Sequence, residues 1–245
     1  MRMTNVLKWL AIAAVMTLTA CSHVSQDALL KTEANLNEKN FFEGWRHFPL
    51  PGKAATIYSF NQLDGRKALT AKAGTSASMM RRDVHIPAAN LEDVSFSWQV
   101  PKLIEGADLA ERDFDDSPVR VVLTFEGDKT KFSAKNAMLS ELAQMMTGEP
   151  LPYATLMYVW CNKRQAGSVV INPRTDRIRS VVVESGSKNL LQWLDYKRNI
   201  RADFEKAFGE APGNLISVGI MTDSDNTRTQ TSAAYGKVFF GGEPL

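Results

Sequence analysis

The sequence predicts an all-β protein, a jelly-roll-like β-sandwich with two inserted helical segments. Short strand-like runs, about ten in number, follow one another from residue 54 onward. Turn signals such as Asp64-Gly65 separate them. Helical spacing of apolar residues occurs in two segments. Strands spaced in this way are typical of sandwiches and jelly rolls.

The strand predicted at the centre of the fold is Ser117–Glu126, which alternates apolar and polar residues. Its odd positions from Val119 to Phe125 share a core face, whereas Arg120 points the other way. The other predicted strands are Ala54–Phe60, Lys67–Ala73, Ser76–Ile86, Asp93–Val100, Thr155–Cys161, Gly167–Ile171, Arg177–Glu184, Leu215–Thr222 and Ala233–Phe240.

The two helical segments are Ser133–Met146, which places Met138, Leu142 and Met145 at helical spacing, and Leu190–Phe208. Gly209 ends the second segment. Core packing over a sheet face or an open edge is the expected role of both. For the Met-rich helix Ser133–Met146, a surface for a protein partner or a lipid is the alternative.

The first residues predict secretion. Arg2 and Lys8 precede an apolar run that is too short to span a membrane, which takes about 20 residues. Leu18-Thr19-Ala20-Cys21 resembles the lipobox of bacterial lipoproteins, and this resemblance implies that Cys21 becomes the lipidated first residue. Ser22 in place of Asp then favours the outer membrane, on its periplasmic side. Several acyl chains, such as palmitate, on Cys21 would give stable anchoring.

Composition divides the chain into a signal peptide (1–20), a lipidated tether (21–40) and a single β-sandwich domain (41–245). Loss of residues 1–20 removes two basic residues and no acidic one. The chain then has 27 basic and 27 acidic residues, in place of 29 and 27. A near-neutral mature chain gives no argument for nucleic acid as a partner. With Cys21 acylated, Cys161 is the one remaining thiol, which excludes a disulfide framework.

Several stretches together resemble a known family. They are Phe41–Arg46, the FSWQVP run at 96–101, Asp113–Phe125, Tyr158–Trp160, the NIRADFEKAFG run at 199–209 and the MTDSDNT run at 221–227. In this order they are similar to the bacterial family called domain of unknown function 3047, over roughly residues 41–241. The resemblance implies no activity, and its layout is similar to carbohydrate-binding jelly rolls.

Three groups of side chains are candidate ligand-binding residues. The acidic loops hold Asp115 and Asp116 before one strand, and Asp223 and Asp225 before another. If the loops meet, their oxygens could hold calcium, but capping of backbone N–H groups in turns is the favoured interpretation. Arg120 could bind a ligand or pair with a neighbouring acid. The aromatic candidates for stacking on sugars are Tyr158, Trp160 and Trp45, with Arg46 beside it.

No zinc motif, nucleophile motif or phosphate-binding loop occurs in the chain, which favours binding over catalysis. The sequence therefore predicts an outer-membrane-anchored periplasmic lipoprotein that binds an envelope glycan without catalysis. One alternative is a glycan hydrolase that uses Asp115 or Asp116 with Asp223 or Asp225. Another is a structural or assembly partner of an envelope protein, with the Met-rich helix as its contact.

Overall fold

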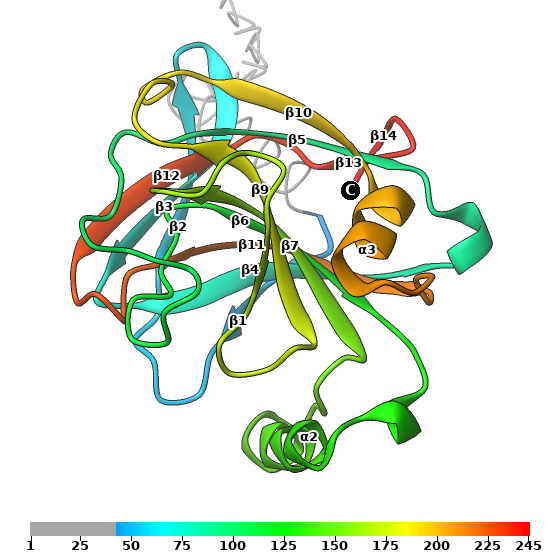
Figure 1. Cartoon of the computed structure of the whole chain (residues 1–245). Coiled ribbons are helices and arrows are strands. Elements are labelled where there is room, and N and C mark those ends of the chain that lie inside the picture. The colour runs from blue at the N-terminus through cyan, green and yellow to red at the C-terminus, as the bar shows by residue number, and fades with distance from the viewer. Residues whose placement is uncertain (1–42) are drawn as a thin grey trace, which may run out of the picture. The chain divides into compact units, whose positions relative to one another are not determined.

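The structure is a computed structural model that describes residues 43–245 (Figure 1). The predicted signal peptide, Cys21 and the tether lie outside the described residues. Contact clustering places residues 41–245 in one unit, and its described part consists of two β-sheets and two α-helices. The predicted all-β sandwich with two helical insertions is therefore confirmed.

The first sheet has seven strands in the order β1-β4-β11-β6-β7-β9-β8. All its pairs are antiparallel except β7 with β9. Its strands are β1 (Trp45–Pro49), β4 (Ala77–Ile86), β6 (Arg120–Phe125), β7 (Ala154–Cys161), β8 (Val169–Ile171), β9 (Ile178–Ser185) and β11 (Leu215–Asp223).

The second sheet follows the order β14-β13-β5-β12-β3-β2, with β10 paired to β5. Its strands are β2 (Ile57–Leu63), β3 (Arg66–Gly74), β5 (Asp93–Gln99), β10 (Leu194–Asn199), β12 (Gln230–Tyr235), β13 (Phe239–Phe240) and β14 (Glu243–Pro244). The helical elements are α2 (Ala134–Thr147), α3 (Ile200–Phe208) and two 3₁₀ turns, Ala88–Asn90 and Lys129–Lys131.

The main core lies between the two sheets. On β6, Val121 and Phe125 alternate inward as predicted, and the facing residues of β5 include Phe96 and Trp98. Tyr158 of β7 stacks on Phe96 with ring centroids 5.4 Å apart. These large side chains from both sheets are buried, and their burial stabilises the domain.

The prediction for Leu190–Phe208 was wrong in its first half. Leu194–Asn199 is strand β10, whose Tyr196 packs against Phe96 and Trp98 of β5, and only Ile200–Phe208 is helical. The Asn199 side chain accepts a hydrogen bond from the Ala202 N–H at 2.8 Å and so begins the helix. Pairing between strands therefore decided the structure where the spacing of apolar residues was ambiguous.

The outer face of the first sheet, turned away from the second sheet, is the surface that positions the candidate site. Neighbouring strands place Met79, Met221 and Arg120 side by side across it, because Met221 is opposite both other residues. Helix α2 lies in the connection between β6 and β7, and its ribbon stands apart from those of the two sheets in Figure 1. None of the helices in the described part has the length and hydrophobicity that crossing a bilayer requires.

Candidate functional site

A cleft of about 480 Å³ lies between the outer face of the first sheet and helix α2. Volumes of about 300–1,000 Å³ are usual for small-molecule sites. Strands β4, β11, β6 and β7 contribute its floor, and the segment 149–152 lines one wall. Its lining is mainly aliphatic, with Leu50, Met79, Val122, Met157, Ile178 and Met221 on one side and Leu139, Leu142, Ala143 and Met146 of α2 on the other.

Polar contacts hold α2 at both of its ends. Near its start, the buried Asn136 donates to Asp176 at 2.6 Å and accepts from the Thr175 hydroxyl at 2.8 Å. Just beyond its end, Glu149 accepts hydrogen bonds from Arg81 of β4 at 2.7 and 2.9 Å. The helix is thus fixed to the β8–β9 connection at one end and to the sheet at the other.

The middle of α2 contributes little to the core. Met138 is 62% exposed and Met145 is 78% exposed, and Asn136 is the helix's only fully buried residue. The expectation that this Met-rich helix packs into a core was therefore wrong. Anchoring through its ends keeps the helix in place and leaves the apolar cleft beneath it.

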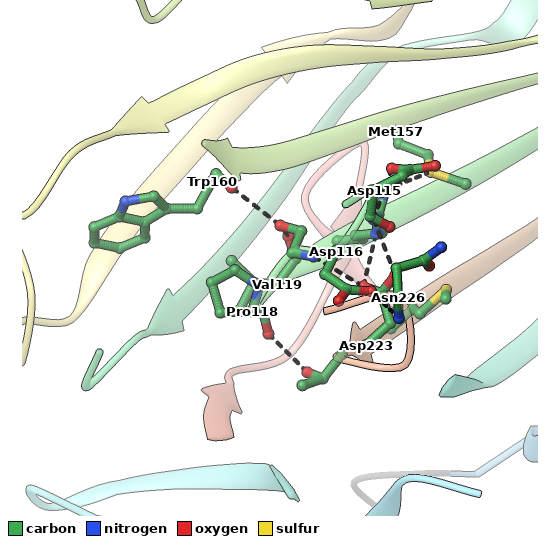
Figure 2. A network of polar contacts seen from close by, with 12 residues as sticks. Asp115, Asp116, Pro118, Val119, Met157, Trp160, Asp223 and Asn226 are labelled. Atoms are coloured by element: carbon green, nitrogen blue, oxygen red, sulfur yellow. Dashed lines mark hydrogen bonds and ion pairs between the residues drawn. The ribbon is translucent and has the colours of Figure 1, made fainter. Parts of the chain in front are cut away.

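Arg120 lies at the floor of the cleft with only 4% of its surface exposed. Its Nε and Nη2 donate to the two carboxylate oxygens of Asp223, both at 2.9 Å. Nη2 also donates to the Asp115 carbonyl at 3.0 Å and to its carboxylate at 3.1 Å. Figure 2 shows Asp115, Asp116, Asp223 and Asn226 close to one another in this network. The alternative in which Arg120 pairs with neighbouring acids to organise the loops is the arrangement observed.

Electrostatics at Arg120 follow from burial. Burial alone would lower the pKa of the guanidinium, but the charges of Asp223 and Asp115 outweigh it, so the pKa is raised. Burial raises the pKa of Asp223, against the opposing charge of Arg120. The two oxygens of Asp223 nevertheless accept three N–H bonds, the third from Ser117 at 3.1 Å, and this geometry suits the ionised carboxylate.

The two predicted acidic loops do meet. Asp116 accepts hydrogen bonds from the backbone N–H groups of Asn226 and Thr227 at 3.2 and 2.7 Å. Carboxylate oxygens of Asp116, Asp223 and Asp225 lie within 4.8 Å of one another. Each is already occupied, by backbone N–H groups, by Arg120 and by Lys53 respectively. This donor set does not fit calcium, because cations and N–H donors hold the oxygens that would coordinate the ion.

A second ionic cluster closes the other end of the cleft. Arg81 binds Glu149 through both of its terminal nitrogens, and Arg46 reaches the same carboxylate at 3.4 Å. These hydrogen bonds, chiefly those from Arg81, hold the pKa of Glu149 below its ordinary value of 4.5 despite partial burial. Glu149 is therefore ionised at neutral pH and connects the end of α2 to β4.

Four of the nine predicted ligand-binding residues line the cleft, namely Asp115, Arg120, Asp223 and Asp225. Asp116 lies beneath them as a loop cap, and Arg46 reaches the cleft only through Glu149.

The predicted aromatic contacts need correction. Tyr158 and Trp160 are fully buried in the core between the sheets, and Trp45 packs against the same core. None of these three lines the cleft, because each points to the inner face of its strand.

Sequence reasoning missed the other charged and polar residues of the cleft. They are the charged residues Lys53, Arg81, Glu149 and Arg174 and the polar residues Thr124, Thr147, Thr155, Asn172 and Asn226. Arg81 could have been identified from the sequence, because it shares a face of the predicted strand Ser76–Ile86 with Met79 and Ala77. Glu149 and Arg174 lie in loops, where alternation gives no orientation.

The fold and the cleft define a class: a two-sheet jelly-roll protein with a helix-covered, mainly aliphatic cleft on one outer sheet face. The chain belongs to the family described as protein of unknown function (DUF3047), whose family model matches residues 43–239. The resemblance to this family is therefore confirmed. No match was found among curated proteins.

Solved structures with a similar fold include three glycan-degrading enzymes. The xyloglucanase domain of NopAA, a type three effector from Sinorhizobium fredii in complex with cellobiose, has 9% identity and a TM-score of 0.43, over 81% of this chain and 94% of its own. A cellulase derived from Cel12A of Rhodothermus marinus has 12% sequence identity and a TM-score of 0.41, and the match covers 80% of this chain and 90% of the cellulase. Endoglucanase 3 of Trichoderma harzianum, from family GH12, has 9% sequence identity and a TM-score of 0.40, and the match covers 81% of this chain and 96% of the endoglucanase. TM-scores below 0.5 carry no argument about function.

Proposed function

We propose that this chain is a non-catalytic binding protein of the bacterial envelope, held at the periplasmic face of the outer membrane by lipidated Cys21. Its α2 cleft takes a mainly apolar ligand. One observation carries the proposal: the cleft is lined by aliphatic side chains, and every carboxylate that lines it is paired with an Arg or Lys. The pairs are Asp115 and Asp223 with Arg120, Glu149 with Arg81, and Asp225 with Lys53.

These pairs argue against the hydrolase alternative. A glycosidase needs one carboxyl that can donate a proton and a second that faces it across the substrate. Asp115 and Asp223 instead share one guanidinium, and Arg81 lowers the pKa of Glu149. No facing pair of unoccupied carboxylates is found among the described residues that line the cleft.

The lining also favours an apolar ligand over a sugar. Pyranose rings are held by exposed flat aromatic faces with polar neighbours. Phe48 is the one aromatic side chain among the described residues that line the cleft, and the guanidinium of Arg81 lies 4.4 Å from its ring centre. An envelope glycan stays a prediction from the sequence. Flexible methionines, here Met79, Met146, Met157 and Met221, adapt to apolar ligands of varied shape.

The experiment is a calorimetric titration of residues 21–245 carrying Cys21→Ser, with 1-decanoylglycerol below its micelle concentration. We expect saturable binding at one site, with a negative heat-capacity change from apolar burial. The variant Ala143→Trp places an indole on the cleft side of α2 and should abolish binding. Ala137→Trp is the matched control, because Ala137 is exposed on the same helix and does not line the cleft.

Equal binding by the wild type and Ala143→Trp would place the ligand elsewhere. Binding of cellobiose in preference to 1-decanoylglycerol would return the assignment to a glycan.

A further inference from the structure

The buried guanidinium of Arg120 has donor capacity that the protein does not use. Arginine carries five N–H donors, and those of Nε and Nη2 are taken by Asp223 and Asp115. For Nη1, the one contact among the described residues is the thioether sulfur of Met157 at 3.9 Å, and sulfur is a weak acceptor. Buried donors are normally hydrogen-bonded.

Nη1 contacts a residue of the cleft lining, since Met157 lines the cleft. Arg120 and Met157 both line it, and Arg120 is 4% exposed. Met221 and Val122 line the same part of the floor, so a ligand atom that reaches Nη1 would be attached to a group that lies among aliphatic side chains. This combination of one polar anchor within an apolar lining is typical of small-molecule sites.

The charge around Arg120 selects a neutral acceptor. The cations of this end of the cleft are Lys53, Arg120 and Arg174, and the carboxylates are Asp115, Asp116, Asp223 and Asp225. Three positive charges against four negative ones leave no net positive charge that would attract an anion. A free carboxylate or phosphate would meet like charges on the buried aspartates, whereas a carbonyl oxygen accepts a hydrogen bond from Nη1 without adding charge.

The occupied acceptors around Arg120 favour an ester over an alcohol or an amide as the ligand group. A hydroxyl or an amide N–H would bring a donor of its own, and the oxygens of Asp115 and Asp223 already accept from Arg120, Asn172 and Ser117. An ester brings acceptors alone. We propose that the cleft binds a fatty-acyl ester, with the chain between α2 and the sheet and the ester carbonyl on Nη1 of Arg120. This inference rests on the proposed function and specifies its ligand.

The test compares three ligands with one chain length on residues 21–245 carrying Cys21→Ser. 1-Decanoylglycerol has the ester carbonyl, 1-decylglycerol is the ether that lacks it, and decanoate is the anion. We expect the ester to bind at least tenfold more tightly than the ether, because a hydrogen bond to a buried charged donor is lost. We expect decanoate to bind more weakly than the ester.

A second measurement uses the variant Arg120→Lys, checked for folding by circular dichroism. Lysine keeps the positive charge but lacks Nη1, so the preference for ester over ether should disappear. Equal affinity of wild-type protein for ester and ether would overturn the ester inference and leave the apolar-ligand function standing. Tighter binding of decanoate would also overturn it. Failure of all three ligands to bind would overturn both proposals.

Discussion

At the scale of single residues, Arg120 has two roles. Two of its nitrogens join the loop before β6 to the end of β11 through Asp115 and Asp223. Its third nitrogen, Nη1, contacts Met157, which lines the cleft. Because the guanidinium is planar, fixing Nε and Nη2 on Asp223 also fixes the direction of Nη1. The pair that stabilises the loops therefore also sets the geometry of the proposed anchor.

Removal of this charge should destabilise the domain strongly. Arg120→Met leaves two buried carboxylates without their partner, a change that costs about 3–5 kcal/mol when a buried pair is broken. Urea denaturation of wild type and variant measures the loss. Arg66→Met is the control, because Arg66 binds Asp195 in a similar two-point manner on an exposed surface. A similar loss of unfolding free energy in both variants would contradict the role of Arg120 in stabilising the domain.

Residue positions also show the limits of reading the sequence alone. Alternation correctly placed Arg120 on the non-core face of its strand. Whether the loops of Asp115 and Asp223 meet was left open by the sequence, and the structure joins them through Arg120. Tyr158 and Trp160 are candidate ligand contacts from the sequence because their strand is apolar on both faces, one of which a helix or a ligand must cover. Which face meets the second sheet depends on how the sheets pack, and a single strand's pattern does not contain that information.

At the scale of elements, α2 is the unusual part of the molecule. Its cap residues are strong signals, since Ser133 accepts from the Asn136 N–H and Gly148 takes the left-handed conformation at φ 78°. The helix itself was therefore predictable. Its position off the sheet was not, because it depends on the contacts of Asn136 and Glu149 with distant loops and strands.

The Glu149 contact should make α2 sensitive to acid. The folded protein lowers the pKa of Glu149, so its contribution to stability is present above the unfolded value of about 4.5 and is lost as pH falls through the lower folded value. Glu149 is partly exposed, so Glu149→Gln should cost about 1 kcal/mol or less at pH 7. For a domain of this size that is a fall in Tm of about 2–4 °C per kcal/mol.

Melting of wild type and Glu149→Gln from pH 7 to pH 3 measures this dependence. The two melting temperatures should converge as the pH falls through the lowered pKa of Glu149 in the folded protein, because the wild-type carboxylate then takes up its proton. Glu141→Gln serves as the control, because Glu141 is exposed on the same helix and makes no ion pair within the described residues. A constant difference at every pH would show that the pair with Arg81 is not the cause.

At the scale of the whole molecule, the two-sheet sandwich is the architecture that the sequence predicted. Most predicted strands correspond to observed ones, since strands with one core face have a distinct alternating pattern. β1 was not predicted, and its pairing with β4 at the sheet edge accounts for the position of Trp45 and Arg46. Neither short edge strands nor the partner of a strand can be read from local alternation.

The proposed anchoring is tested in the living cell. Cys21→Ser should leave residues 43–245 folded and release the protein from the membrane fraction, because stable anchoring needs acyl chains on that residue. Fractionation followed by immunodetection gives the distribution, and circular dichroism of the released protein reports its fold. Retention of the variant in the membrane fraction would contradict lipidation as the anchor.

The position of α2 in the chain has a consequence for how the family can diversify. The helix lies wholly within the connection between two neighbouring strands, β6 and β7, and the core between the sheets includes none of its residues. Insertions, deletions or exchange of this one segment can therefore alter the width and chemistry of the cleft while the strands stay as they are. The two sheets would stay constant, and replacement of the 14 residues of α2 alone should change the lining of the cleft.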